Sequence, residues 1–263
     1  MSALLQMPLY LSLLIVFFVG FGIAVLSMRL IKNKLAQEFL RENHDVAGFI
    51  FNSFTMMYAV LISFVVFINW SEYDKAQQNI FLETDELSKL FNNAQGFPDS
   101  LKKEIQYAVL NYCMLVANVE WDLMKYGKKS EEVNTAYNNL WNVFLKMDVN
   151  KLPNVIIYQE SLARMNIFSE KRRLRYHNMA NTIPDIVWFI VLLSAAISSA
   201  FTYFFGMKHK VPHYLMGIIY TVVNAMMLFL IYVLDHPFSS SLLIRNESFL
   251  EIIQYFQKVM SVM

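Results

Sequence analysis

The sequence has little charge, and four long stretches of it have none. Only 16% of the 263 residues are Asp, Glu, Lys or Arg, whereas soluble domains carry about 25%. Residues 1–28, 46–71, 186–207 and 211–234 contain no Asp, Glu, Lys or Arg at all. About 20 apolar residues suffice to cross a hydrocarbon layer as a helix, and each stretch is longer than that. The sequence therefore excludes an ordinary soluble domain and predicts four transmembrane helices.

Cysteine, glycine and proline are scarce as well. The single cysteine, Cys113, excludes an intramolecular disulfide and any zinc site built from several cysteines. Seven glycines and six prolines are too few for a low-complexity or β-rich chain, and backbone in lipid has to satisfy its own hydrogen bonds. We therefore expect an all-α membrane protein, with Cys113 buried as a small apolar side chain.

Catalytic motifs are missing too. We find no glycine-rich phosphate loop, nucleophile elbow or carboxylate dyad, so we predict no enzyme, no catalytic residue, no metal and no cofactor. With 22 basic and 21 acidic residues, no net field would attract nucleic acid. A membrane enzyme that uses His44, Asp45, Asp235 or His236 is the weakest of the alternatives we consider.

The uncharged stretches divide the chain into four parts. An even number of spans places both termini on the same side of the membrane as the long charged segment. Lys and Arg counts near the span ends are six on one side and seven on the other, so they do not decide the orientation. The predicted parts are a transmembrane hairpin (1–71), a helical aqueous domain inserted between the second and third spans (72–185), a second hairpin (186–238) and a C-terminal helix (239–263).

The charged segment has the pattern of a helical domain. No glycine or proline lies between Phe49 and Gln95, so the second span is predicted to continue into this domain as one helix of roughly 70 Å. We expect the next helices to begin at Pro98-Asp99-Ser100, Ser130 and Val155, and the first of these to stop at Gly127. One apolar stripe at helical spacing follows that first helix: Leu101, Ile105, Ala108, Tyr112, Leu115, Val119 and Leu123.

Polar and small side chains share one face of the second span, within about 60° of a line. Two interpretations remain open for this stripe, helix packing and a pore lining. A bundle of four helices fills its own interior, so a pore requires several copies around an axis. The third span has small residues at a spacing that indicates helix packing: Ser194, Ala195, Ser198 and Ser199. The fourth span repeats the stripe of the second, with Gly217, Thr221, Asn224 and Asp235. The candidate pore residues are Asn52, Thr55, Ala59, Ser63 and Val66.

A run of basic residues, 171–175, precedes the third span by about ten residues. It is compatible with a solvated face, an anchor for anionic lipid headgroups, or an electrostatic funnel for anions. We expect the first two interpretations to account for most of it.

Several strings in the sequence resemble the bestrophin-like domain family, a group of mostly bacterial four-span membrane proteins. The resemblance covers nearly the whole chain. The residues that carry it are His44-Asp45-Val46-Ala47-Gly48, the apolar string 58–66, Glu120-Trp121, Ile183-Pro184 with Trp188, and Asp235-His236-Pro237-Phe238.

The resemblance implies an arrangement similar to bestrophins, which are pentameric anion channels whose second helix lines the pore. It implies a homo-oligomer in a bacterial inner membrane that conducts inorganic ions, with the termini and residues 72–185 in the cytoplasm. A ring of Asp45 side chains would instead favour cations, so the residues leave selectivity open and the resemblance favours anions. The acidic run with which animal bestrophins bind calcium has no counterpart after Asp235. The alternative function is a non-conducting scaffold or sensor whose cytosolic helices bind a partner.

Overall fold

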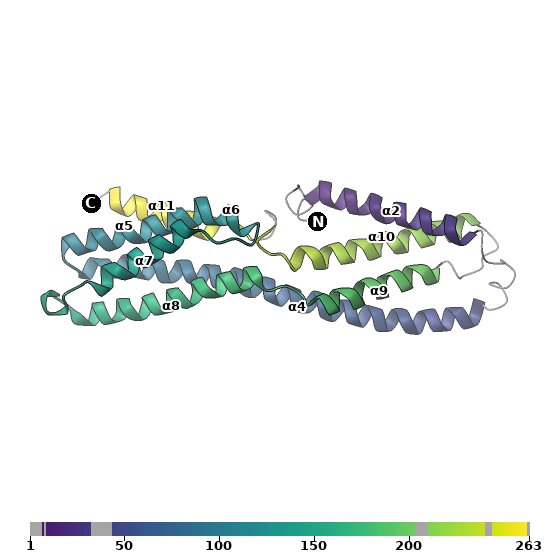
Figure 1. The fold of residues 1–263 in the computed structure, drawn as a ribbon, viewed down its shortest axis with the longest axis horizontal. Helices are drawn as coiled ribbons and strands as arrows, with labels where there is room; N and C mark the ends of the chain where they lie inside the picture. The colour runs from purple at the N-terminus through teal and green to yellow at the C-terminus, as the bar shows by residue number, and fades with distance from the viewer. Residues whose placement is uncertain (1–6, 8, 33–43, 203–209, 240–243, 262–263) are drawn as a thin grey trace. The chain divides into compact units, whose positions relative to one another are not determined.

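The computed structural model describes residues 7, 9–32, 44–202, 210–239 and 244–261, and every regular element within them is helical (Figure 1). The elements are α2 (Leu9–Lys32), α4 (His44–Asn93), the 3₁₀ turn η1 (Ala94–Gly96), α5 (Asp99–Leu115), the π-helical turn η2 (Val116–Glu120), α6 (Trp121–Met124), α7 (Glu131–Leu145), the 3₁₀ turn η3 (Val149–Lys151), α8 (Val155–Ala180), α9 (Asp185–Phe201), α10 (Lys210–Leu234) and α11 (Glu247–Ser261).

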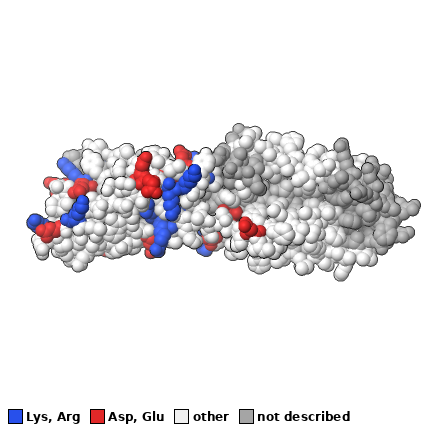
Figure 2. Space-filling model, viewed as in Figure 1, with Lys and Arg blue, Asp and Glu red and all other residues white. Residues whose placement is uncertain are grey.

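The chain divides into two compact units. We call Met1–Ser71 with Thr182–His236 the membrane unit, and Glu72–Asn181 with Pro237–Met263 the charged unit. Helix α4 contributes residues to both. Most Lys, Arg, Asp and Glu side chains visible in Figure 2 come from the charged unit.

Among the residues that the structure describes, three apolar helical segments are long enough to cross a membrane, Gly48–Gly96, Val155–Phe201 and Tyr214–Leu234, and a shorter one covers Leu11–Leu26. These helices identify a multi-pass membrane protein. In the membrane unit, α2 packs against α10 and α10 against α9. A small apolar cluster of Val65, Val191 and Ile231 joins α4 to α9 and α10.

The charged unit has a closed apolar core. Its largest side chains include Phe91, Phe144, Phe168 and Phe256, each fully buried. The rings of Phe91 and Phe256 stack with centroids 4.0 Å apart, which joins the end of α4 to α11. Cys113 is fully buried, as expected, and burial raises the pKa of its thiol well above the usual range. The thiol therefore remains protonated and shielded.

Local signals explain where the helices of the charged unit begin and end. The predicted start at Ser130 is confirmed, because the Ser130 hydroxyl caps α7 by accepting a hydrogen bond from the Val133 amide at 3.3 Å. The predicted stop at Gly127 is also confirmed. Gly127 has a φ of 68°, a conformation that favours glycine, and the amide of Lys128 donates to the Leu123 carbonyl at 3.1 Å. The helix predicted from Val155 extends to Ala180.

The predicted apolar stripe of 101–123 is wrong beyond Leu115. There the helix makes a π turn, in which the Trp121 amide donates to the Val116 carbonyl five residues earlier. The additional residue in this turn rotates the following face by one position. As a result Glu120 and Met124 are buried, while Val119 and Leu123, which the stripe would have buried, are partly exposed.

Candidate functional site

The candidate pore stripe lies along the membrane half of α4. Asn52, Ala59 and Ser63 are exposed in the single chain, and they lie within about 40° of one another around the helix axis at 100° per residue. The hydroxyl of Ser63 donates to the Ala59 carbonyl at 2.8 Å, so it is satisfied within its own helix. These three side chains thus form a narrow, uncharged line that no other described part of the chain covers.

Thr55 and Val66 lie at the edge of this line. Both are partly buried, and Val66 packs against the cluster that joins α4 to α9 and α10. The Thr55 hydroxyl is buried and has no hydrogen-bond partner among the described residues. The five candidate residues therefore divide into three that face outward and two that face the chain's own helices.

The polar residues of the third and fourth spans hold helices together. Asn224 of α10 accepts a hydrogen bond from the Tyr58 hydroxyl of α4 at 2.5 Å, and donates to the Ala195 carbonyl and the Ser198 hydroxyl of α9, both at 3.2 Å. Interhelical hydrogen bonds of this kind fix helices where no water competes. The packing interpretation of the small residues in α9 is thus supported by specific contacts.

Asp235 fixes the break between α8 and α9. Its carboxylate accepts hydrogen bonds from the Ile183 amide at 2.6 Å and from the Trp188 indole at 3.2 Å. Pro184 stands at the N-cap position of α9, directly between these two donors in sequence. The His236 ring lies 3.6 Å from the same carboxylate. The strings 183–188 and 235–238, which are far apart in sequence, therefore form one joint.

The other motif residues have different positions. Trp121 is buried and packs its ring against Phe238 and Phe249, at centroid distances of 6.2 and 6.0 Å. His44 and Asp45 belong to the first turn of α4, but their side chains lie outside the described part of the structure. The predicted ring of Asp45 side chains therefore stays a prediction. Gly48 is partly exposed and Pro237 is buried.

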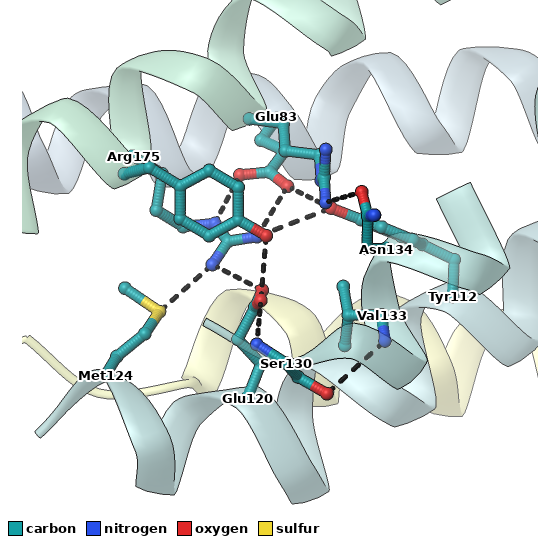
Figure 3. Close-up of polar contacts among 10 residues, drawn as sticks. Glu83, Tyr112, Glu120, Met124, Ser130, Val133, Asn134 and Arg175 are labelled. Carbon is teal, nitrogen blue, oxygen red and sulfur yellow. Dashed lines mark hydrogen bonds and ion pairs between the residues drawn. The ribbon is translucent and has the colours of Figure 1, made fainter. Parts of the chain in front are cut away.

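An ion network is buried in the charged unit (Figure 3). The guanidinium of Arg175, from α8, donates through Nε to Glu83 of α4 at 2.7 Å and through Nη1 to Glu120 at 2.9 Å. All three side chains are fully buried. Figure 3 shows the guanidinium between the two carboxylates, with the sulfur of Met124 3.0 Å from Nη1. The network thereby joins three helical segments.

Neutral donors complete the network. The hydroxyl of Tyr112 donates to Glu83 at 2.8 Å, and the hydroxyl of Tyr176 donates to Glu120 at 2.7 Å. The Ser130 amide donates to Glu120 as well, at 3.2 Å. Each carboxylate thus accepts several hydrogen bonds, the arrangement that a buried ionised carboxylate requires.

The environment determines the charge states of Arg175 and Tyr112. Burial alone would lower the pKa of Arg175, but attraction by Glu83 and Glu120 raises it well above its usual value, so the guanidinium stays charged. Burial, and then the charge of Glu83, raises the pKa of Tyr112 far above its usual range, so the phenol keeps its proton. The network therefore contains two carboxylates, one guanidinium and two neutral phenols, which is an arrangement for holding helices together and not for proton transfer.

Little in the sequence indicates this network. In the sequence Glu120 stands out only as part of a motif, Glu83 has no distinguishing signal, and Arg175 is assigned with the rest of the basic run to a solvated face or a headgroup anchor. That assignment is wrong for Arg175, which is fully buried because Glu83 and Glu120 supply its charge partners. Only Arg173 of the three arginines in the run is exposed, and Arg172 is partly buried. A signal in retrospect is the periodicity of α8, which places Arg175 on the same face as Phe168 and Met165.

The chain matches the model of a known family. The model of the bestrophin-like domain matches residues 14–249, which is most of the chain. No curated protein matches the sequence.

Solved membrane proteins share the fold. A crystal structure of a bacterial bestrophin homologue from Klebsiella pneumoniae, a single-substitution variant, matches with a TM-score of 0.67 and 9% identity, covering 95% of this chain and 99% of that one. Another crystal structure, of a single-substitution variant described only as a membrane protein, matches with a TM-score of 0.71 and 9% identity, covering 95% and 98% of the two chains. At this identity the likeness establishes the fold.

Proposed function

The chain belongs to the bestrophin-like domain family, and on that premise we propose that it is one subunit of an oligomeric ion channel in which α4 surrounds the pore. The subunit crosses the bacterial inner membrane four times, and the charged unit, inserted between the second and third spans, lies on the cytoplasmic side with both termini. Five copies form the channel, and anions are the favoured ions. The number of copies and the ion come from the resemblance to bestrophins.

The exposed line on α4 is the observation that carries the proposal. Only 11% of the apolar window of α4 is buried within the chain, against 17% for the span that contains α9 and 44% for α10. Most of the membrane half of α4 must therefore be covered by lipid or by further copies. The exposed side-chain amide of Asn52 is unsuited to lipid, so a water-filled axis is the better surrounding for that face.

The chemistry of the line suits a narrow pore. Between residues 46 and 71 no charged side chain is present, so ions passing along α4 would meet amide and hydroxyl groups and small apolar side chains. Such a lining imposes no strong charge selection. Ala59 lies between Asn52 and Ser63 on this line. In a ring of several copies the Ala59 side chains would form an apolar constriction, and such constrictions gate pores by dewetting.

A matched pair of serines tests the pore. Ser53 and Ser63 are both exposed on α4, and both hydroxyls donate to a carbonyl four residues earlier. Their positions differ by about 80° around the helix. In liposomes that contain the purified protein, Ser63→Trp is expected to abolish chloride flux measured with a fluorescent indicator, whereas Ser53→Trp leaves most of it.

The flux assay also discriminates against the alternative function. A scaffold whose α4 line serves only for packing would give no flux of chloride, sodium or potassium with the unmodified protein. Equal effects of both tryptophan variants would exclude α4 as the pore lining. Mass photometry of the detergent-solubilised protein gives an independent result: a ring of four or more copies supports the channel, and a monomer or dimer supports the scaffold.

A further inference from the structure

A polar groove on the charged unit borders the buried network, with which it shares Ser130 and Tyr176. It is bounded by the first turn of α7 and the middle of α8, and it encloses about 730 Å³. Its walls contain hydroxyls, amides and three cationic side chains. The lining residues that matter below are Lys129, Asn134, Tyr137, Arg172, Arg173 and Tyr176.

The cations of this groove lack acidic partners. Among the arginines of the charged unit, Arg164, Arg175 and Arg245 each pair with a glutamate. Arg172 and Arg173 pair with no carboxylate in the described part of the chain, and neither does Lys129. Cations that converge on a concavity and are not neutralised by an ion pair form an attractive site for an anion.

Arg172 is held in place before any ligand arrives. Its guanidinium lies 4.2 Å from the ring centre of Tyr137 and 4.9 Å from that of Tyr176, and Nη2 donates to Asn134 at 3.4 Å. Nε is buried and has no acceptor among the described residues. The ammonium of Lys129 also lies over Tyr176, 4.6 Å from its ring centre. Because these contacts restrict the cations, a ligand would lose less entropy in binding to them.

Two carboxylates limit the charge of the groove. Glu131 and Glu170 also belong to its lining, and Glu170 lies 3.6 Å from Lys171. With three cations and two carboxylates the lining keeps one net positive charge. A ligand with concentrated negative charge fits this balance better than a cation, and arginine forks match the geometry of phosphate oxygens.

We propose that this groove binds the phosphate group of a small ligand, with Arg173 and Lys129 as the charged contacts and Arg172 as a pre-positioned donor. The phosphate belongs either to a soluble phosphorylated molecule or to a lipid headgroup. Arg173 precedes the end of α8 by seven residues, roughly 10 Å of helix. The proposal does not depend on ion conduction.

Titration of the full-length protein in phosphatidylcholine nanodiscs with inorganic pyrophosphate tests the site. We expect saturable binding in isothermal titration calorimetry that weakens as salt is raised. Arg173→Gln and Lys129→Gln should each weaken it about tenfold. Arg172 is left unchanged, since its stacking between two tyrosines also supports the fold.

Two further variants make the test specific. Glu131→Gln removes a competing carboxylate and should tighten pyrophosphate binding severalfold, a gain that a misfolded protein cannot produce. Lys103→Gln removes an exposed, unpaired lysine on α5, outside the groove, and should change nothing. Absence of saturable binding, or equal weakening by Lys103→Gln and Arg173→Gln, would overturn the proposal.

Nanodiscs that contain phosphatidic acid distinguish the two sources. If the headgroup occupies the groove, phosphatidic acid competes with pyrophosphate, and native mass spectrometry detects more retained phosphatidic acid on the unmodified protein than on Arg173→Gln. If a soluble ligand occupies it, pyrophosphate binds equally in both kinds of nanodisc. Either result supports the phosphate site and names its source.

Discussion

Large aromatic side chains have opposite surroundings in the two units. In the charged unit, Phe168 and Phe256 are fully buried within one chain, whereas in the membrane unit Phe49 and Phe67 on α4 are 77% and 69% exposed. The charged unit therefore closes its own core in water by burying apolar surface. The membrane unit leaves its apolar surface to be covered by lipid or by other copies, and holds its helices with specific polar contacts such as those of Asn224.

The buried network provides the sharpest test of the closed core. Arg175→Met removes the cation that pairs with both Glu83 and Glu120, and leaves these two buried carboxylates without a charge partner among the described residues. We expect a loss of about 4 kcal/mol of stability. The sole cysteine, Cys113, is buried in the same unit, so labelling of its thiol under native conditions should accelerate by about 10³-fold.

Arg245→Met is the matched control for this variant. Arg245 is exposed and pairs with exposed Glu247, and such a surface pair contributes little. Labelling of Cys113 should stay as slow as in the unmodified protein. Slow labelling in Arg175→Met would mean that the network contributes nothing to holding the charged unit together.

Phenylalanine truncation compares the two units directly. Phe256→Ala leaves a cavity beside Phe91 and should cost about 3 kcal/mol, measured by Cys113 labelling. Phe64→Ala, on α4 of the membrane unit, removes a ring that is 65% exposed in the single chain and should leave the labelling unchanged. If Phe64→Ala instead dissociates an oligomer seen by mass photometry, copies and not lipid cover that position.

The joint at Asp235 tests how far polar contacts determine the membrane unit. Asp235→Asn keeps one oxygen that accepts from the Ile183 amide, but it replaces the oxygen that accepts from the Trp188 indole with an NH₂ group. The expected cost is about 1 to 2 kcal/mol, seen as a lower thermal midpoint of the detergent-solubilised protein. Asp185→Asn changes an exposed acid at the start of α9 and should have no effect. Equal midpoints for the two variants would contradict the role of this joint.

Much of the helical architecture could be predicted because its signals are local. The absence of glycine and proline from 49 to 95 allows α4 to be expected as one helix. Ser130 begins α7, and Gly127 follows the end of α6, through hydrogen bonds among near neighbours in the chain. The π turn was missed because a constant 100° per residue cannot represent an extra residue in one turn. The proposed pore line remains a prediction, although its outward-facing members are now restricted to Asn52, Ala59 and Ser63.

The sequence by itself determined that this protein has apolar helices of membrane-spanning length, where most of its helices begin and end, and that its charges lie between the uncharged stretches. Those properties follow from composition and from contacts within a few residues. Only the tertiary structure decided that Arg175 is buried and Arg173 exposed, because the partners of Arg175 lie 92 and 55 residues away in the chain. A charged side chain can be buried only where folding brings its counter-charges to it.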